Sequence, residues 1–139
     1  MSDLPTPERP AVRLEREECW DLLRAEAFGR LGYRLVDEIH VVPVNYGVHD
    51  GELFVRTGAG NKLLAAALEY DVGFEIDGFT SEEVAWSVLV RGRLRRLDEH
   101  RARLVEERVP SWVPMLLKYE VLEIVPTSVT GRRFLIQRD

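Results

Sequence analysis

A strand–turn–strand pattern over residues 39–56 constrains the fold of this chain more than any other feature. Residues 39–48 are rich in β-branched side chains, and residues 52–56 form a second extended segment. Between them stands His49-Asp50-Gly51, and an Asp-Gly pair tolerates the positive φ angles that a tight hairpin turn requires. The sequence therefore predicts an antiparallel hairpin at this point.

Further strand signals follow along the chain. Alternating apolar residues or many β-branched residues predict strands at residues 31–36, 71–79, 84–97, 119–125 and 132–137. Six or seven antiparallel strands, most of them joined by hairpins, favour closure into a small barrel because closure removes exposed sheet edges. We therefore expect a mostly β fold with short helices, built as a small barrel.

Pro43 interrupts the first strand of the predicted hairpin. Proline cannot donate to a strand ladder, so it marks a sheet edge or a bulge. A bulge over residues 43–46 would turn backbone groups outward toward a ligand. The alternative is a structural kink that serves no ligand.

The segment 14–28 predicts an amphipathic helix. Trp20, Leu23 and Ala27 recur at helical spacing, and Gly29 offers a C-terminal stop.

Two shorter helices are expected further along. Asn61 is an N-cap candidate for a helix over residues 62–69, and Asp98 is one for a charged helix that ends near residue 108. An irregular crossing pinned by two prolines is expected over residues 109–118.

The length of 139 residues is that of one domain. Residues 1–13 contain prolines at positions 5, 7 and 10, which predict an extended N-terminal arm. Residues 14–139 are then expected to form the single folded domain.

Composition excludes several classes of protein. A net charge of −5 argues against a dedicated nucleic-acid binder, and the longest apolar run, residues 63–68, is far below the ~18 residues of a membrane span. We expect no nucleic-acid or membrane partner.

The single Cys19 excludes an intrachain disulfide and is expected to be buried as a small hydrophobic residue. The lack of disulfides predicts a reducing, cytoplasmic compartment for the protein. The three histidines, His40, His49 and His100, lack metal-ligand spacing, so no metal is expected and each is predicted to be a surface residue.

A candidate anion pocket follows the hairpin. Arg56-Thr57 ends the second strand, residues 58–60 form a glycine-bracketed loop, and Asn61-Lys62 opens the next helix. Helix N-termini leave backbone N–H groups unpaired and carry partial positive charge, so a phosphate can bind there. Lys62 at the first helical position is disfavoured by the helix dipole, and a shared anionic ligand would offset that cost. An exposed, solvated lysine is the alternative.

Four groups of residues stand in an order and spacing typical of one protein family. They are Pro43-Val44-Asn45-Tyr46, Arg56-Thr57 with Gly60-Asn61-Lys62-Leu63, Ala85-Trp86-Ser87 with Val88-Leu89-Val90-Arg91-Gly92, and Thr130-Gly131-Arg132-Arg133. Together they resemble the pyridoxamine 5′-phosphate oxidase-like, flavin-binding split-barrel proteins, in particular their short bacterial branch. The resemblance covers roughly residues 14–134 and implies an FMN-binding split β-barrel. Asn61 stands where Ser is frequent in the family, and Ala85 where Gly is common.

The resemblance also implies an assembly and a cofactor site. A homodimer would hold two FMN molecules in clefts between the subunits, with residues 43–46 beneath the isoalloxazine ring. Trp112 and Arg132 or Arg133 are candidates for contribution by the partner subunit. The cofactor-binding positions that it implies are Pro43, Val44, Asn45, Tyr46, Arg56, Thr57, Asn61, Lys62, Trp86, Ser87, Trp112 and Arg132 or Arg133.

The expected function is that of a flavin-dependent oxidoreductase acting on a small molecule, with the redox chemistry supplied by the cofactor. No residue can be named as catalytic acid or base. The alternatives are a deazaflavin-dependent reductase, a non-catalytic flavin carrier or sensor, and, more weakly, a haem-binding barrel. Arg91, Arg93 and Arg95 share one strand face and could meet an anionic cofactor tail; the alternative is a solvated row paired with acids such as Glu99, Glu106 or Glu107.

Overall fold

The fold is described from a computed structural model over residues 4–58, 66–108 and 119–137. The predicted helix over residues 62–69 and the crossing over residues 109–118 lie largely or wholly outside these ranges. In chain order the elements are β1 (Ala11–Arg13), α1 (Arg16–Ala25), β2 (Phe28–Leu35), β3 (Glu38–His49), β4 (Glu52–Gly58), β5 (Asp71–Phe79), β6 (Val84–Arg96), α3 (Glu99–Arg108) and β7 (Tyr119–Leu135).

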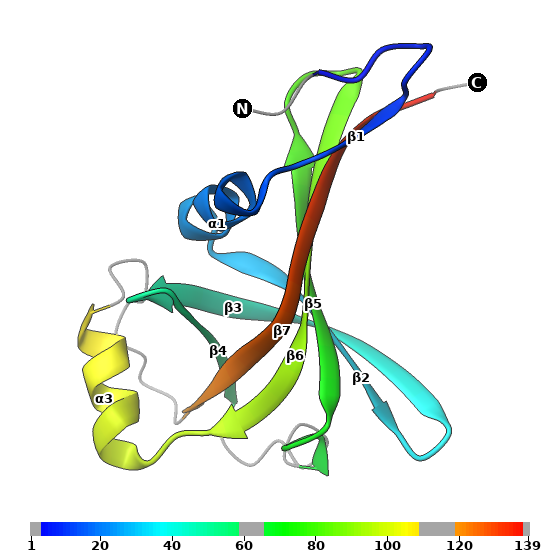
Figure 1. The fold of residues 1–139 in the computed structure, drawn as a ribbon. Helices are drawn as coiled ribbons and strands as arrows, with labels where there is room; N and C mark the ends of the chain where they lie inside the picture. The colour runs from blue at the N-terminus through cyan, green and yellow to red at the C-terminus, as the bar shows by residue number, and fades with distance from the viewer. Residues whose placement is uncertain (1–3, 59–65, 109–118, 138–139) are drawn as a thin grey trace.

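The strands form one antiparallel sheet that closes on itself. Its order is β1-β7-β4-β3-β2-β5-β6, and β6 pairs again with β7 to complete the ring. The short β1 adds to an edge of β7, so the last residues of the N-terminal arm lie beside the C-terminal end of the chain (Figure 1). The predicted β-barrel of six to seven strands is confirmed.

The β3–β4 hairpin has the turn that the sequence predicted. Asp50 and Gly51 have φ angles of 51° and 75°, and His49 pairs with Glu52 across the turn. Two successive positive φ angles match the twist of the flanking strands, which is why Asp-Gly suits this position.

Pro43 lies on a sheet edge, not in a bulge. The register from Phe28↔Asn45 to Leu35↔Glu38 runs without a shift. Of the two positions that the sequence allowed for Pro43, the sheet edge is therefore confirmed and the bulge over residues 43–46 is wrong. β4 pairs with β3 only from Asn45 onward, and among the described strands residues 38–44 of β3 therefore pair on one side alone. That free edge accommodates the missing N–H of proline.

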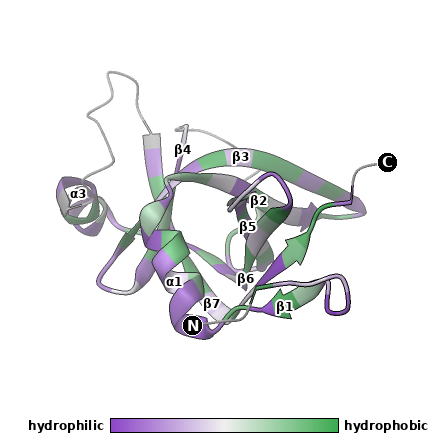
Figure 2. Ribbon diagram, turned by 90° about the horizontal axis from the view of Figure 1, so that it is seen from above, coloured by the Kyte–Doolittle hydropathy of each residue, from purple (hydrophilic) through white to green (hydrophobic). Residues whose placement is uncertain are grey.

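The barrel interior is apolar and is covered at one end by α1 (Figures 1 and 2). Cys19 and Leu23 of α1 are fully buried, which confirms the expected burial of the cysteine. The Tyr46 hydroxyl donates a hydrogen bond of 2.7 Å to the Leu23 carbonyl oxygen, which attaches the helix to β3.

α1 is shorter than the sequence pattern predicted. Its N-terminus is set by a capping box between Glu15 and Glu18. At the other end the Ala27 carbonyl accepts the Tyr46 N–H at 3.0 Å, and Phe28 already begins β2. Gly29, expected as a helix stop, lies in β2, where a Cβ atom would come within 2.6 Å of the Phe74 ring.

A second, smaller core lies beneath α3, outside the barrel. Phe54, Leu97, Val105 and Val121 are buried there. The Asp98 carboxylate accepts the Arg101 N–H at 2.7 Å, which confirms the predicted cap.

β7 is a single strand of 17 residues, where the sequence predicted two. It pairs with β6 along nearly its whole length, with one register shift at Arg91/Gly92. Neither α1 nor α3, nor any other helix in the described part of the chain, is long and apolar enough to span a membrane.

Candidate functional site

Asn45 and Arg56 lie directly opposite each other at the end of the β3–β4 hairpin. Residues alternate between the faces of a strand, so Pro43 shares the outer face with Asn45, and both are exposed. Val44 and Tyr46 turn inward and are buried in the core. The outer face of this hairpin therefore exposes Pro43 and Asn45 beside the free edge of β3, and Arg56 lies on the same face.

Arg56 is held against α3. Its side chain is 8% exposed, and its Nη1 atom lies 3.6 Å from Glu106 Oε1. Thr57, the next residue, is half-buried. The other half of the predicted anion pocket, Asn61 and Lys62, lies outside the described residues, as does Trp112.

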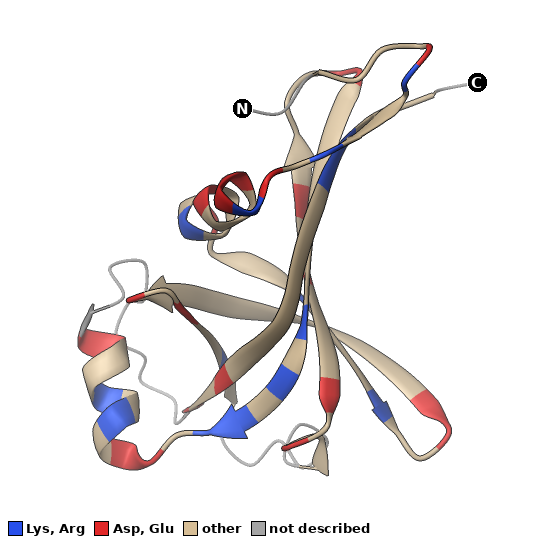
Figure 3. Ribbon diagram, in the orientation of Figure 1, with Lys and Arg blue, Asp and Glu red and all other residues tan. Residues whose placement is uncertain are grey.

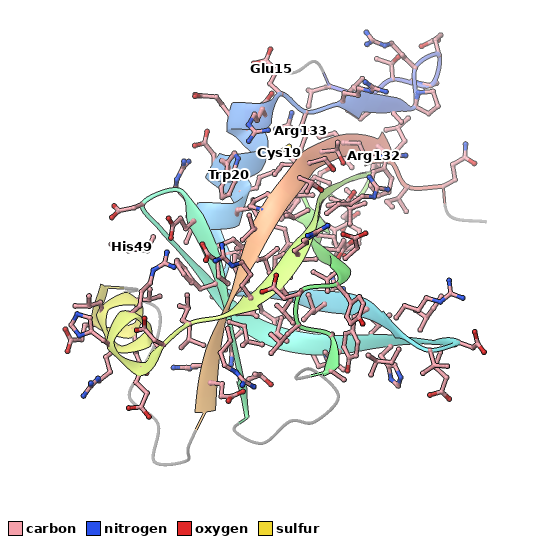
Figure 4. The ribbon with its side chains drawn as sticks, turned by 60° about the horizontal axis from the view of Figure 1, so that its bottom comes forward. Glu15, Cys19, Trp20, His49, Arg132 and Arg133 are labelled. Carbon is pink, nitrogen blue, oxygen red and sulfur yellow. The ribbon has the colours of Figure 1, made fainter. Side chains whose placement is uncertain are left out.

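Trp86 and Arg133 are opposite each other on β6 and β7. The Trp86 side chain is buried in the main core and closely fills the space above Gly78. Arg133 Nη1 lies 3.2 Å from Glu18 Oε2 on α1, and Figure 4 shows Arg133 on the α1 side of β7. In this structure Arg133 therefore attaches α1 to β7, and Trp86 fills part of the main core.

Ser87 and Arg132, one residue along each strand, lie on the opposite face of the sheet, because side chains alternate between the two faces of a strand. They line an open groove of about 990 Å³ on the outer face of β6, β7 and β1. Its lining residues are Ala11, Val12, Arg13, Leu14, Glu75, Ser87, Leu89, Arg91, Val129, Thr130, Gly131, Arg132 and Phe134. We call it the β6–β7 groove.

Beside this groove, Arg30 is shared by two carboxylates of β5. Its Nη2 atom lies 2.7 Å from Glu75 Oε1 and also contacts Asp77. The pKa of Glu75 is raised, first by burial and then by its hydrogen bond to Asp77. The pKa of Asp77 is lowered, first by the same hydrogen bond and also by Arg30. Of the two carboxyl groups, Glu75 is therefore the one with the higher pKa.

Sequence reasoning missed Arg13, Glu75 and Thr130 as groove residues. Arg13 belongs to the predicted arm, and its position follows from the pairing of β1 with β7, which no local pattern reveals. Glu75 and Asp77 alternate with the buried residues Phe74 and Ile76. From that alternation the sequence could have predicted that both carboxylates lie on the outer face of the strand.

Figure 3 shows basic stretches along β6. The arginines of the predicted row on this strand lie in three different environments. Arg91 lines the β6–β7 groove. Arg93 Nε lies 3.8 Å from Asp71, and Arg95 lies opposite Glu123 on β7. Arg93 and Arg95 therefore lie beside acidic residues, as one alternative predicted. These acids are Asp71 and Glu123, and the predicted ones were Glu99, Glu106 or Glu107.

Two of the histidines lie at the barrel surface. The His40 ring stacks on Tyr33 at 5.3 Å between centroids, and His49 Nε2 lies 3.2 Å from Asp50. Both side chains are 24% exposed, so they are less exposed than expected. Within the described ranges no three His, Cys, Asp or Glu residues gather in a way that could hold a metal ion.

The sequence profile of the family described as pyridoxamine 5′-phosphate oxidase matches residues 15–133. A solved FAD binding protein from Mycobacterium smegmatis is 34% identical, with a TM-score of 0.76 over 89% of this chain and 98% of that chain. An FAD-binding protein from Mesorhizobium loti is 25% identical, with a TM-score of 0.72 over 88% and 97%. An uncharacterized protein from Rhizobium meliloti is 27% identical over 127 residues, which are 85% of this chain and 81% of that protein.

Proposed function

The chain belongs to the pyridoxamine 5′-phosphate oxidase family, and we propose that it is a flavin-binding oxidoreductase whose ring site is the outer face of the β3–β4 hairpin. FMN, expected from the sequence, and FAD, in the names of two similar structures, share the isoalloxazine ring, the ribityl chain and the first phosphate. This shared part is what the hairpin would bind.

The free edge of β3 is the observation that carries the proposal. Over residues 38–44 it pairs with β2 alone among the described strands, so its second side offers backbone acceptors and, except at Pro43, backbone donors. The pyrimidine edge of an isoalloxazine ring carries a matching alternation of carbonyl and N–H groups. Pro43 and Asn45, both exposed on this strand, would lie against the ring.

Arg56 would bind the phosphate. It is placed directly opposite Asn45, one residue before Thr57 and close in sequence to the candidate pair Asn61 and Lys62. A phosphate there would share the guanidinium with Glu106, which lies 3.6 Å from it. When bound, the flavin supplies the hydride or electron transfer, and the chain holds and orients it.

A homodimer is part of the proposal. Asn45 and Arg56 lie on β3 and β4, whereas Ser87 and Arg132 lie on β6 and β7 and face outward from a different part of the ring. A second copy would allow both groups to serve one cofactor. The small-molecule substrate, the absence of a nucleic-acid partner and a cytoplasmic location remain predictions.

An absorption spectrum of the purified protein tests the proposal. We expect a flavin band near 450 nm (roughly, a property of the cofactor itself), bleaching with NAD(P)H, and a dimeric mass by light scattering. A flavin that is retained but accepts no electrons would favour the carrier alternative. A colourless protein that binds a deazaflavin and no flavin would favour the deazaflavin-dependent reductase.

A further inference from the structure

Glu106 is poorly satisfied in its ion pair with Arg56. The 3.6 Å between Arg56 Nη1 and Glu106 Oε1 is longer than the charge-assisted hydrogen bonds of about 2.7–2.9 Å that a guanidinium usually makes to a carboxylate. Glu106 Oε1 is also buried, and it accepts no hydrogen bond in the described part of the chain. A buried carboxylate oxygen without a hydrogen bond is costly. Glu106 is therefore held by a contact that can be exchanged for a better one.

The attachment of α3 to β4 does not depend on Glu106 alone. Glu52 and Phe54 lie on the face of β4 that α3 covers, because alternate residues of a strand share a face. Arg101 Nη2 of α3 lies 2.8 Å from Glu52 Oε2, and Val105 is buried in the same small core as Phe54. These two contacts hold the helix in place, so the Glu106 side chain can turn without moving it.

Arg103 offers Glu106 a second partner. It lies three residues before Glu106 on α3, and residues three apart on a helix are neighbours. Both side chains line one open groove of about 600 Å³ beside the helix, and Figure 3 shows basic residues in the middle of α3 with acidic residues toward its ends. Arg103 is exposed, and within the described ranges it has no carboxylate within 4.0 Å.

We propose that Glu106 is a switch residue of the phosphate site, which pairs with Arg56 in the ligand-free protein and turns to Arg103 when a phosphate binds. The inference rests on the proposed function and adds the regulation of the same site. Two anionic groups around one guanidinium that is only 8% exposed repel each other. The phosphate would also be held by Thr57 and Lys62, whereas Glu106 Oε1 lacks a hydrogen bond. The carboxylate is therefore the group that moves.

The switch gives Arg103 an effect on a ligand that it does not touch. By pairing with the displaced carboxylate, Arg103 stabilises the ligand-bound state, whereas the pair of Glu106 with Arg56 stabilises the ligand-free state. The effect of Arg103 must then disappear when Glu106 carries no charge. General attraction between an arginine and a nearby anion would persist in that case.

A double-mutant cycle on flavin affinity tests the inference. Fluorescence titration with FMN and with FAD should show that Arg103→Gln weakens binding about two- to fivefold, because the displaced carboxylate loses its partner. In a Glu106→Gln background the same substitution should leave the affinity unchanged. Arg96→Gln is the matched control, since Arg96 lines the same groove but lies 3.8 Å from Glu120, and it should bind flavin like the wild type.

Thermal unfolding of the ligand-free proteins gives a second readout. Arg103→Gln should keep the wild-type midpoint, and a lower midpoint would assign Arg103 a structural role instead. The inference is overturned, with the flavin function left standing, if Arg103→Gln binds flavin like the wild type, loses affinity equally in both backgrounds, or loses no more than Arg96→Gln. Failure of the wild-type protein to bind either flavin, or unchanged affinity in Arg56→Ala, would overturn the phosphate site together with the switch.

Discussion

Arg56 Nη1 lies 3.6 Å from Glu106 Oε1, and this ion pair joins the end of the β3–β4 hairpin to α3. Arg56 is the candidate phosphate ligand, so its guanidinium already has an anionic neighbour that a cofactor phosphate would have to share. If Arg56 binds the phosphate as proposed, the pair would adjust the affinity of the site as well as attach the helix.

Replacing the two partners should change flavin affinity in opposite directions. Arg56→Ala should weaken binding by about 1.5–3 kcal/mol, since a charge-assisted hydrogen bond is lost. Glu106→Gln should tighten it by about two- to tenfold because the competing charge is removed. Flavin fluorescence titration measures both, with Glu99→Gln in the exposed first turn of α3 as the charge-matched control. Weaker binding in Glu106→Gln would mean that the carboxylate positions Arg56 for the ligand instead of competing with it.

The hydrogen bond between Tyr46 and Leu23 should contribute measurably to stability. Tyr46 is fully buried, so Tyr46→Phe leaves the Leu23 carbonyl without its 2.7 Å partner and should lower the free energy of unfolding by about 1–3 kcal/mol. Urea denaturation of the cofactor-free protein measures the change.

Tyr33→Phe is the matched control. The Tyr33 hydroxyl is buried and has no hydrogen-bond partner among the described residues, so its removal should be neutral or stabilising. Equal losses in the two variants would contradict the role assigned to the Tyr46 hydroxyl.

Glu123 should make stability decrease as pH rises. Burial raises the pKa of its carboxyl above 4.5, opposed by Arg101. Between about pH 4.5 and the folded-state pKa the native protein therefore binds more protons than the unfolded chain, and stability falls with increasing pH. Glu123→Gln removes this dependence, so its stability relative to the wild type should be greater at pH 7 than at pH 4. Urea denaturation at the two pH values measures the difference, and a difference of the opposite sign would mean that Arg101 dominates over burial.

Local patterns in the sequence predicted the elements that depend on neighbouring residues. The turn at Asp50-Gly51 and the cap at Asp98 require only a few adjacent positions, and both are confirmed. Barrel closure was also predicted correctly, because the prediction required only the number of strands and their connection by hairpins.

Pairing between distant segments could not be predicted in the same way. α1 ends early because the Ala27 carbonyl bonds to Tyr46, and β7 is continuous because β6 pairs along it. The β6–β7 groove was not predicted for the same reason, because Arg13 lies opposite Arg132 only through the pairing of β1 with the C-terminal part of β7. Of the candidate site residues, Asn45 and Arg56 lie opposite each other through the predicted hairpin, although the sequence analysis did not pair them. Nothing local indicated that Trp86 is buried while Ser87 faces the groove.

Gly92 should tolerate no side chain, because it lies at the register shift between β6 and β7. A Cβ atom there would come within 2.2 Å of the Val125 carbonyl oxygen, which is backbone and cannot rotate away. Gly92→Ala should therefore lower the free energy of unfolding by about 1–3 kcal/mol or more. Gly73, on the adjacent β5, is the control. A Cβ atom at Gly73 would have a Leu89 methyl group at 3.8 Å as its nearest contact, which is an ordinary van der Waals distance. Because alanine also reduces the conformational entropy of the unfolded chain, Gly73→Ala should be neutral or stabilising. Thermal unfolding of the two variants in parallel measures the contrast, and a Gly92→Ala protein as stable as Gly73→Ala would show that the two strands can separate at this point without cost.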